Sequence, residues 1–312
     1  MPTPQYAANL AEQLSSMIDG APKAVDVVQL AQPDVGTVQK RLKELIGRVA
    51  EVAGLEQERP TVETQRVRTV MSLPGQLRAT GFHASGAMSV ALALAPFDDL
   101  FESDPGDDEL VALSQRVAEG LGLQKLVPGD ESLTFERLWR VKAAGGNQKG
   151  TMTEPVLCRA IGAYRHYVRE LPVYGRASVT VELAAKGRPA SASVSVRRFA
   201  GDEVGKTIAK AAVRKPADAA RDVAAHLVEA FGGQEELKST GLIAEWFRFG
   251  YLSLSRRHTQ GLLAPFYIAS IAVEREYEAS AHVIAVSGSE EQFMRIPPGR
   301  RTSAPKRPAM AA

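Results

Sequence analysis

A run of aromatic and basic residues in the C-terminal third is the first part of this sequence able to contact a ligand. It comprises Trp246, Phe247, Phe249, Tyr251, Arg256, Arg257 and His258. Side chains alternate between the faces of a strand, so Trp246 would face one side and the other three rings the opposite side. Three rings on one face favour burial in a core, and the alternative is a platform that stacks on nucleic-acid bases. Trp246, Arg256 and Arg257 are therefore candidate binding residues.

A second group of aromatic, basic and histidine side chains lies in the middle of the chain. It consists of Tyr164, His166, Arg169 and Tyr174, in a stretch whose alternating apolar pattern predicts strands. We expect these side chains either to line a ligand-facing side of a sheet or to belong to an ordinary solvated face. They complete the set of candidate binding residues.

The residue types that usually perform catalysis do not fall into a recognisable pattern. No i, i+4 pair on a helix and no cysteine at metal-ligand spacing occurs among the five histidines, His83, His166, His226, His258 and His282. Cys158, the single cysteine, lies eight residues from His166 on one predicted strand. At about 3.3 Å per residue the two are about 26 Å apart, too far for a nucleophile and its base. We therefore expect no catalytic residue, no metal site and no cofactor.

The predicted elements alternate between helices and antiparallel strands. Apolar residues recur at helical spacing in residues 4–18 and in residues 34–54, where Asp34 can cap the first turn. Then follow strands at 62–72 and 77–95, a helix at 107–121, a strand meander at 133–199, a helix at 203–231 divided near Pro216, and strands at 242–255, 262–273 and 277–286. Helices segregated from antiparallel strands indicate an α+β fold. A helix followed by a meander occurs twice, at 107–199 and 203–288.

The stretch that begins at Tyr164 has a distinctive order of aromatic, basic and turn residues. It reads Tyr164-Arg165-His166-Tyr167-Val168-Arg169-Glu170-Leu171-Pro172-Val173-Tyr174-Gly175, then Val179-x-Val181 and Lys186-Gly187. This order resembles the aromatic-Arg…Leu-Pro-Val-x-Gly…Gly signature of PepSY-like and FTP-like propeptide domains, and Pro265-Phe266-Tyr267 resembles a late strand of such modules. The family usually has glycine where this chain has Glu170. The resemblance implies two cystatin-like modules, each a helix packed on an antiparallel sheet, with a binding or inhibitory role.

Composition indicates a folded body and a basic C-terminal tail. The chain has 312 residues, of which 45% are hydrophobic and 24% charged, and its net charge is +2. Its last 18 residues contain no acid and carry Arg295, Arg300, Arg301, Lys306 and Arg307, so the remainder sums to about −3. We expect a helical region at 1–56, α+β modules at 60–200 and 201–294, and a disordered tail at 295–312. Such a tail either serves mainly to keep the protein soluble or contacts nucleic acid or another anionic surface.

Neither a secretory signal nor a membrane-spanning segment is expected. The N-terminal residues have no basic region followed by an apolar run, and no window reaches 18 apolar residues. With one cysteine and no signal, the sequence favours a cytoplasmic location.

Three functions remain open from the sequence. The preferred one is a non-catalytic binding or inhibitor-like protein that engages a protein partner through an exposed sheet face or edge. An uncovered edge near Val179–Val196 would favour it. The second is a structural component that assembles into an oligomer through its N-terminal helices. The third is an enzyme whose pocket is built from scattered residues.

Overall fold

The computed structural model of this protein contains four α-helices and fifteen strands among the residues that it describes. These residues are 5–18, 20–56, 58–94, 99–127, 131–146, 151–175, 178–198, 206–231, 241–275 and 278–296. The helices are α1 (Gln5–Ser16), α2 (Val35–Val52), α3 (Asp107–Gly120) and α4 (Pro216–Ala230). The strands are β1 (Ala24–Gln29), β2 (Thr61–Thr64), β3 (Arg68–Leu73), β4 (Leu77–Phe82), β5 (Met88–Leu92), β6 (Glu131–Ala143), β7 (Val156–Val168), β8 (Leu171–Gly175), β9 (Ser178–Leu183), β10 (Pro189–Val194), β11 (Thr207–Ala212), β12 (Gly241–Ser253), β13 (Leu262–Leu263), β14 (Pro265–Arg275) and β15 (Glu278–Ser287).

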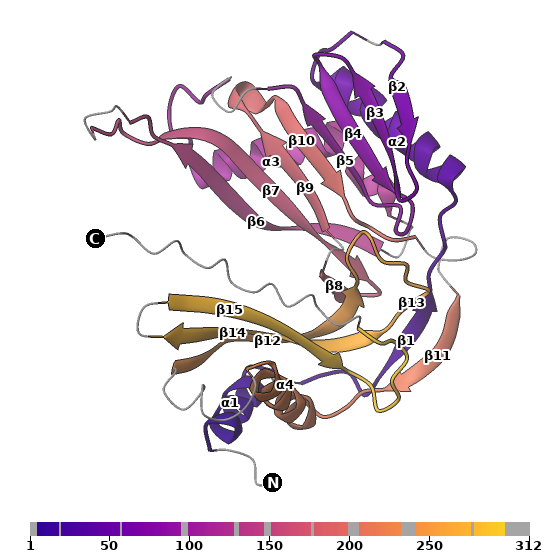
Figure 1. The fold of residues 1–312 in the computed structure, drawn as a ribbon, viewed down its shortest axis with the longest axis vertical. Coiled ribbons are helices and arrows are strands. Elements are labelled where there is room, and N and C mark those ends of the chain that lie inside the picture. Colours follow the sequence, from indigo (N-terminus) through magenta and orange to yellow (C-terminus); the bar gives the residue numbers. More distant parts are fainter. Residues whose placement is uncertain are drawn as a thin grey trace, which may run out of the picture.

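Most of the strands join in one large sheet. Their order is β15-β14-β12-β8-β7-β9-β10-β5-β4-β3-β2, and β6 pairs with β7 beside this path. All neighbours are antiparallel except β8 and β12, which run parallel where Tyr251–Ser253 pairs with Val173–Gly175. Figure 1 shows that β8 joins an upper half of the sheet to a lower half formed by β12, β14 and β15. The two predicted meanders therefore share one sheet.

Each half of the sheet is covered by two helices on one face (Figure 1). Helices α2 and α3 cover the upper half, where Leu42 and Val49 of α2 pack in one cluster with strand residues such as Val181. Helices α1 and α4 cover the lower half, and Leu14 and Leu227 pack there. The apolar stripes read from the sequence are thus buried within the chain. The predicted N-terminal cap is present, because the Asp34 carboxylate accepts a hydrogen bond from the Thr37 N–H at 2.9 Å.

The mixed α+β class is confirmed, and the N-terminal helices divide between the two halves. Helix α1 contacts α4 and β12, whereas α2 contacts β3, β4 and β5. A helix followed by an antiparallel meander occurs three times: α2 with β2–β5, α3 with β6, β7, β9 and β10, and α4 with β12, β14 and β15. The sequence predicted only two such units, because α2 was assigned to a separate helical region at 1–56 rather than to the strands that follow it.

The start of the predicted helix at 203–231 is wrong. Residues 207–212 form strand β11, which pairs with β1, and α4 begins only at Pro216. Proline suits the first helical position because its missing N–H would be unpaired there anyway. The β1 strand was not predicted at all. Together β11, β1 and β13 form a small second sheet, so pairing with a distant segment overrides the local pattern here.

Candidate functional site

Strand β15 is the outermost strand of the lower half of the sheet. Among the described residues it pairs only with β14, through a ladder of ten residue pairs without a register shift. From Ser280 to Ser287 it contains no Lys, Arg, Asp or Glu. It is therefore a long and regular edge strand whose part from Ser280 to Ser287 carries no acidic side chain, lysine or arginine.

The hydrogen bonds around β15 show which backbone groups point away from the sheet. The Gly288 N–H donates to the Pro265 carbonyl at 2.9 Å, toward β14. Backbone groups alternate along an antiparallel strand, so those of Ala281, Val283 and Ala285 point outward. The backbone of Ser287 also points away from β14. Its carbonyl accepts a hydrogen bond from Arg214 Nη1 at 3.3 Å, which is not part of the β14–β15 pairing. The N–H and C=O groups of three alternate residues are thus presented at the outer edge.

A groove of about 490 Å³ opens onto the C-terminal part of this edge. Its lining comes from β14, β15, α4, the segment before α4 and the last described residues: Arg214, Asp222, His226, Phe266, Ala285, Val286, Ser287, Ser289, Glu290, Gln292, Arg295 and Ile296. A second hollow of about 680 Å³ adjoins it at the start of α4 and shares Arg214, Asp222 and Glu290 with it. The two hollows together extend from the edge strand to the first turn of α4.

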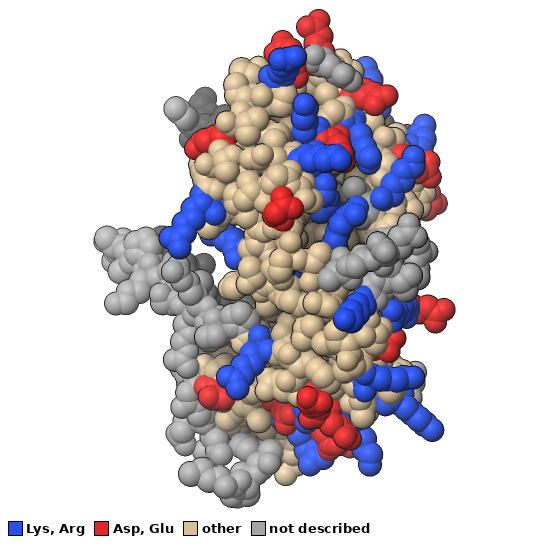
Figure 2. Space-filling view, turned by 90° about the vertical axis from the view of Figure 1, so that its right-hand side faces the viewer, with Lys and Arg blue, Asp and Glu red and all other residues tan. Residues whose placement is uncertain are grey.

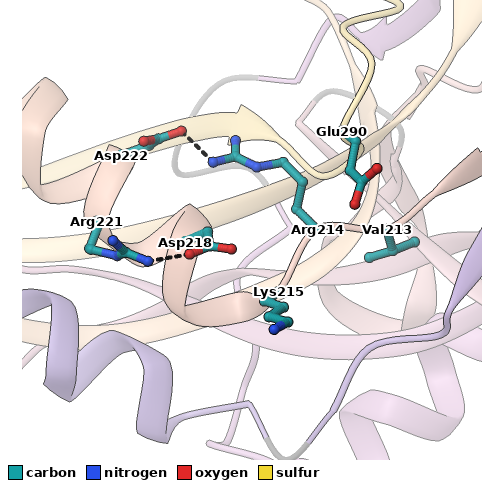
Figure 3. Close-up of a pocket in the computed structure, with 7 residues that line it drawn as sticks. All are labelled: Val213, Arg214, Lys215, Asp218, Arg221, Asp222 and Glu290. Atoms are coloured by element: carbon teal, nitrogen blue, oxygen red, sulfur yellow. Dashed lines mark hydrogen bonds and ion pairs between the residues drawn. The ribbon is translucent and has the colours of Figure 1, made fainter.

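Arg214 forms contacts with α4, β14 and β15 at this site. Figure 3 shows its guanidinium pointing toward Asp222 of α4, with 2.7 Å between Arg214 Nη2 and Asp222 Oδ2. The Arg214 carbonyl accepts a hydrogen bond from the buried Tyr267 hydroxyl at 2.8 Å. Burial raises the pKa of Tyr267 to about 12, so this hydroxyl remains a donor over the ordinary pH range. The segment before α4 is therefore fixed to both β14 and β15.

The charges in the second hollow largely pair with one another. Arg221 forms an ion pair with Asp218 in the first turns of α4, and Lys215 and Glu290 line the same hollow. In the described part of the chain, no group of three or more His, Cys, Asp or Glu side chains is placed to hold a metal ion.

The face of the lower half opposite α1 and α4 carries exposed apolar side chains. Val283 pairs with Ser270, and Ser270 pairs with Trp246, so these three side chains share one face. Val283 is 65% exposed, and Ile243 on the same face is 46% exposed. Trp246 is half-buried, with the Arg248 guanidinium 5.5 Å from its ring centroid. This apolar face lies directly beside the outer edge of β15.

The candidate residues of β7 and β8 do not share one exposed face. Tyr164 is buried toward α3, where its hydroxyl lies 2.9 Å from Ser114 Oγ, and His166 is buried against Glu131. Arg169 lies in the turn before β8 and pairs with Asp26 of β1. Tyr174 is half-buried, with Arg165 stacked over it at 5.1 Å. Even-numbered positions of β7 face the helices, which is why the first two side chains are enclosed.

The aromatic and basic group of β12 is also divided. Phe247 and Tyr251 are buried, as the core interpretation predicted, and Phe247 stacks on Tyr267 with ring centroids 5.2 Å apart. Trp246 alone lies on the apolar face described above. Arg256 and the exposed Arg257 lie in the loop after β12, where Arg256 stacks over Phe82 at 5.3 Å. These side chains do not form a single base-stacking platform.

The uncovered edge considered near Val179–Val196 is not present. Strand β9 pairs with β7 and β10, and β10 pairs with β9 and β5. Both strands are therefore interior to the sheet. A strand at 277–286 was predicted, but nothing in the local sequence indicates that it lies at the edge of the sheet.

Replacing Tyr251 by phenylalanine should lower the free energy of unfolding by about 1 kcal/mol. The Tyr251 hydroxyl donates a hydrogen bond to the Asp26 carbonyl at 2.8 Å and so links β12 to β1. Urea denaturation measures the change. Tyr167→Phe is the control, because no hydrogen bond of its hydroxyl occurs among the described residues. Equal effects of both substitutions would contradict a specific role for the Tyr251 bond.

Comparison with known proteins adds information about the fold only. No family model matches the chain, and no curated protein matches it. A crystal structure of an uncharacterized protein from Eubacterium rectale ATCC 33656 has a similar fold, with a TM-score of 0.52 and 9% sequence identity. The match covers 89% of this chain and 88% of that chain, so the two share most of their architecture.

No helix in the described part of the chain is both long and apolar enough to cross a membrane.

Proposed function

We propose that this protein is a non-catalytic binding protein that accepts an extended segment of a partner protein at the outer edge of β15. One observation carries the proposal. The backbone groups of Ala281, Val283 and Ala285 point outward from a regular part of an edge strand that carries no acid, lysine or arginine, beside a groove. A chain in the β conformation matches this edge, because it presents N–H and C=O groups at the spacing of a neighbouring strand.

A comparison of two long edge strands in the same sheet supports this assignment. Strand β6 has 13 residues and pairs only with β7 in the described part of the chain. Its ladder has register shifts after Phe135 and Val141, and it carries Arg137, Arg140 and Lys142. Bulges and charges are the usual means by which proteins prevent pairing at an edge. Strand β15 has neither between Ser280 and Ser287, so its outer edge is suited to pairing.

The apolar face beside β15 would give such a complex side-chain contacts. Val283 and Ala281 are exposed on it, and Ile243 and Trp246 continue it across the sheet. An added strand places alternate side chains on this face, so a partner segment with apolar residues at every second position would bury Val283. Backbone hydrogen bonds would supply affinity, and this apolar row would select the partner sequence.

The other hypotheses receive less support from the contacts. The apolar stripes of α1 and α2 pack inside the chain, which weakens assembly through the N-terminal helices. Residues 297–312 of the basic tail lie outside the described residues, so contact with nucleic acid or an anionic surface stays a prediction. The PepSY-like inhibitory role also stays a proposal, and three helix-plus-meander units support it.

The experiment uses proline to block the edge. Because the Val283 N–H points outward, Val283→Pro removes a donor from the edge without removing a bond of the β14–β15 ladder. Val62→Pro is the matched control, since Val62 is 54% exposed on edge strand β2. The Gln65 N–H bonds to the Arg68 carbonyl within that hairpin, so alternation points the Val62 N–H outward as well.

A displayed library of unstructured peptides, each ten residues long like β15, is selected on the wild-type protein. We expect the enriched peptides to have apolar residues at alternate positions. Their binding should fall at least about tenfold with Val283→Pro, the loss of one or two backbone hydrogen bonds, and should be unchanged with Val62→Pro. Peptides that bind Val283→Pro equally well would contradict the proposal. A wild-type dimer that Val283→Pro converts to a monomer would instead assign this edge to a second copy.

A further inference from the structure

The turn between β4 and β5 is enclosed by three segments distant in the sequence. Arg197, which follows β10, donates from Nη1 to the Ala84 carbonyl at 3.4 Å and from Nη2 to the His258 carbonyl at 2.8 Å. Ser85 Oγ donates to the Arg256 carbonyl at 2.8 Å. Helix α2 completes the enclosure, because a side chain at Gly86 would lie only 3.3 Å from Arg41 Nη1. The surroundings of this turn are therefore firmly positioned.

Arg41 of α2 lies in this enclosure, and one nitrogen of its guanidinium group makes no hydrogen bond. Its Nη2 is buried and has no hydrogen-bond partner, and among the described residues Arg41 forms no ion pair. Burial and the nearby charge of Arg198 lower the pKa of Arg41 to about 10. Glu44, on the same helix, opposes this only in part. A buried guanidinium donor without an acceptor is costly, so a bound anion that accepted this hydrogen bond would stabilise the folded protein.

A second cation beside Arg41 increases this cost. Arg198 is exposed, and its backbone is fixed because its carbonyl accepts a hydrogen bond from the Ala31 N–H at 2.8 Å. Two guanidinium groups that repel each other near a rigid turn would both be stabilised by one shared anion. Helix α2 lies on the side of the molecule that Figure 2 shows. In that view, Lys and Arg side chains gather over the upper half of the molecule.

We propose that Arg41 and Arg198 form a binding site for a small oxyanion, of the phosphate or carboxylate type, beside the β4–β5 turn. The buried Nη2 of Arg41 would donate to one oxygen of the anion, and Arg198 would approach it from the solvent side. The site is separate in sequence and structure from the β15 edge, so it does not depend on the proposed function.

Thermal unfolding at constant ionic strength tests this site with inorganic phosphate and, separately, acetate, using chloride as the reference anion. We expect a saturable rise in Tm with at least one oxyanion, because a ligand that binds the folded state stabilises it. Arg41→Gln should abolish the rise, and Arg198→Gln should weaken the apparent affinity by about tenfold, the effect of one charged hydrogen bond.

Arg78→Gln is the matched control, because Arg78 is an exposed arginine on β4, and this substitution should leave the response unchanged. The exposed position of Arg198 makes its variant a test that does not depend on how well Arg41→Gln folds. The proposal is overturned if neither oxyanion raises Tm beyond chloride, or if all three variants reduce the response equally.

Discussion

Replacing His166 by leucine is expected to reduce the free energy of unfolding by about 3 kcal/mol, because it removes one partner of a buried hydrogen-bonded pair. His166 is 2% exposed and Glu131, its partner, is 5% exposed. His166 Nε2 lies in close contact with Glu131 Oε2, and the pair links the start of β6 to the end of β7. Leucine offers no hydrogen bond, so the Glu131 carboxylate would lose its imidazole partner in a place that water does not reach.

Urea denaturation of two further variants separates loss of the pair from a general defect. The double variant Glu131→Leu/His166→Leu removes both polar groups, so it should recover much of the stability that His166→Leu loses. His226→Leu, at an exposed position on α4, should change stability by less than about 0.5 kcal/mol. A single His166→Leu variant as stable as the wild-type protein would show that the pair does not stabilise the fold.

Gly250→Ala is expected to destabilise the protein by about 3 kcal/mol, near the upper limit for overpacking in a rigid place. Gly250 lies on β12 where this strand meets β8. A Cβ atom there would lie 2.3 Å from the Pro172 carbonyl oxygen and 2.8 Å from Tyr174 Cε2. The carbonyl is backbone and cannot rotate away, so the two strands would have to separate at the junction between the halves of the sheet.

Gly47→Ala provides a control of opposite sign. Gly47 lies inside α2 and no atom lies within 4 Å of a Cβ placed there, so alanine should stabilise the helix by about 0.5–1 kcal/mol. The midpoints of urea denaturation of both variants measure the contrast. If Gly250→Ala proved as stable as Gly47→Ala, the close approach of β8 and β12 would not be needed for folding.

Several elements could be predicted because their determinants are local. The stripe of α2, its Asp34 cap and the break between the strands predicted at 62–72 and 77–95 all depend on residues within a few positions of one another. The same is true of the burial of Phe247 and Tyr251, because alternation along one strand places them away from Trp246. The α+β class follows from the order of such elements.

Strand β11 shows where local patterns mislead. Thr207–Ala212 contains alanine and lysine at spacings compatible with a helix, yet it forms a strand because β1 pairs with it from more than 170 positions earlier in the chain. The candidate residues Tyr164 and His166 show a similar limit. Alternation separates the two faces of β7, but only the packing of α3 on one of them decides which face is buried.

Local patterns in the sequence indicated the helices, apart from the start of the last one, as well as most strand segments and the α+β class. The tertiary structure alone decided the order of the strands, and with it the joining of the two halves by β8 and the position of β15 at the edge. The burial of His166 with Glu131 and of the Arg41 Nη2 without a hydrogen-bond acceptor were decided in the same way. The physical reason is that periodicity reports which face of an element is apolar, whereas strand order and charge environment depend on contacts between residues distant in the chain.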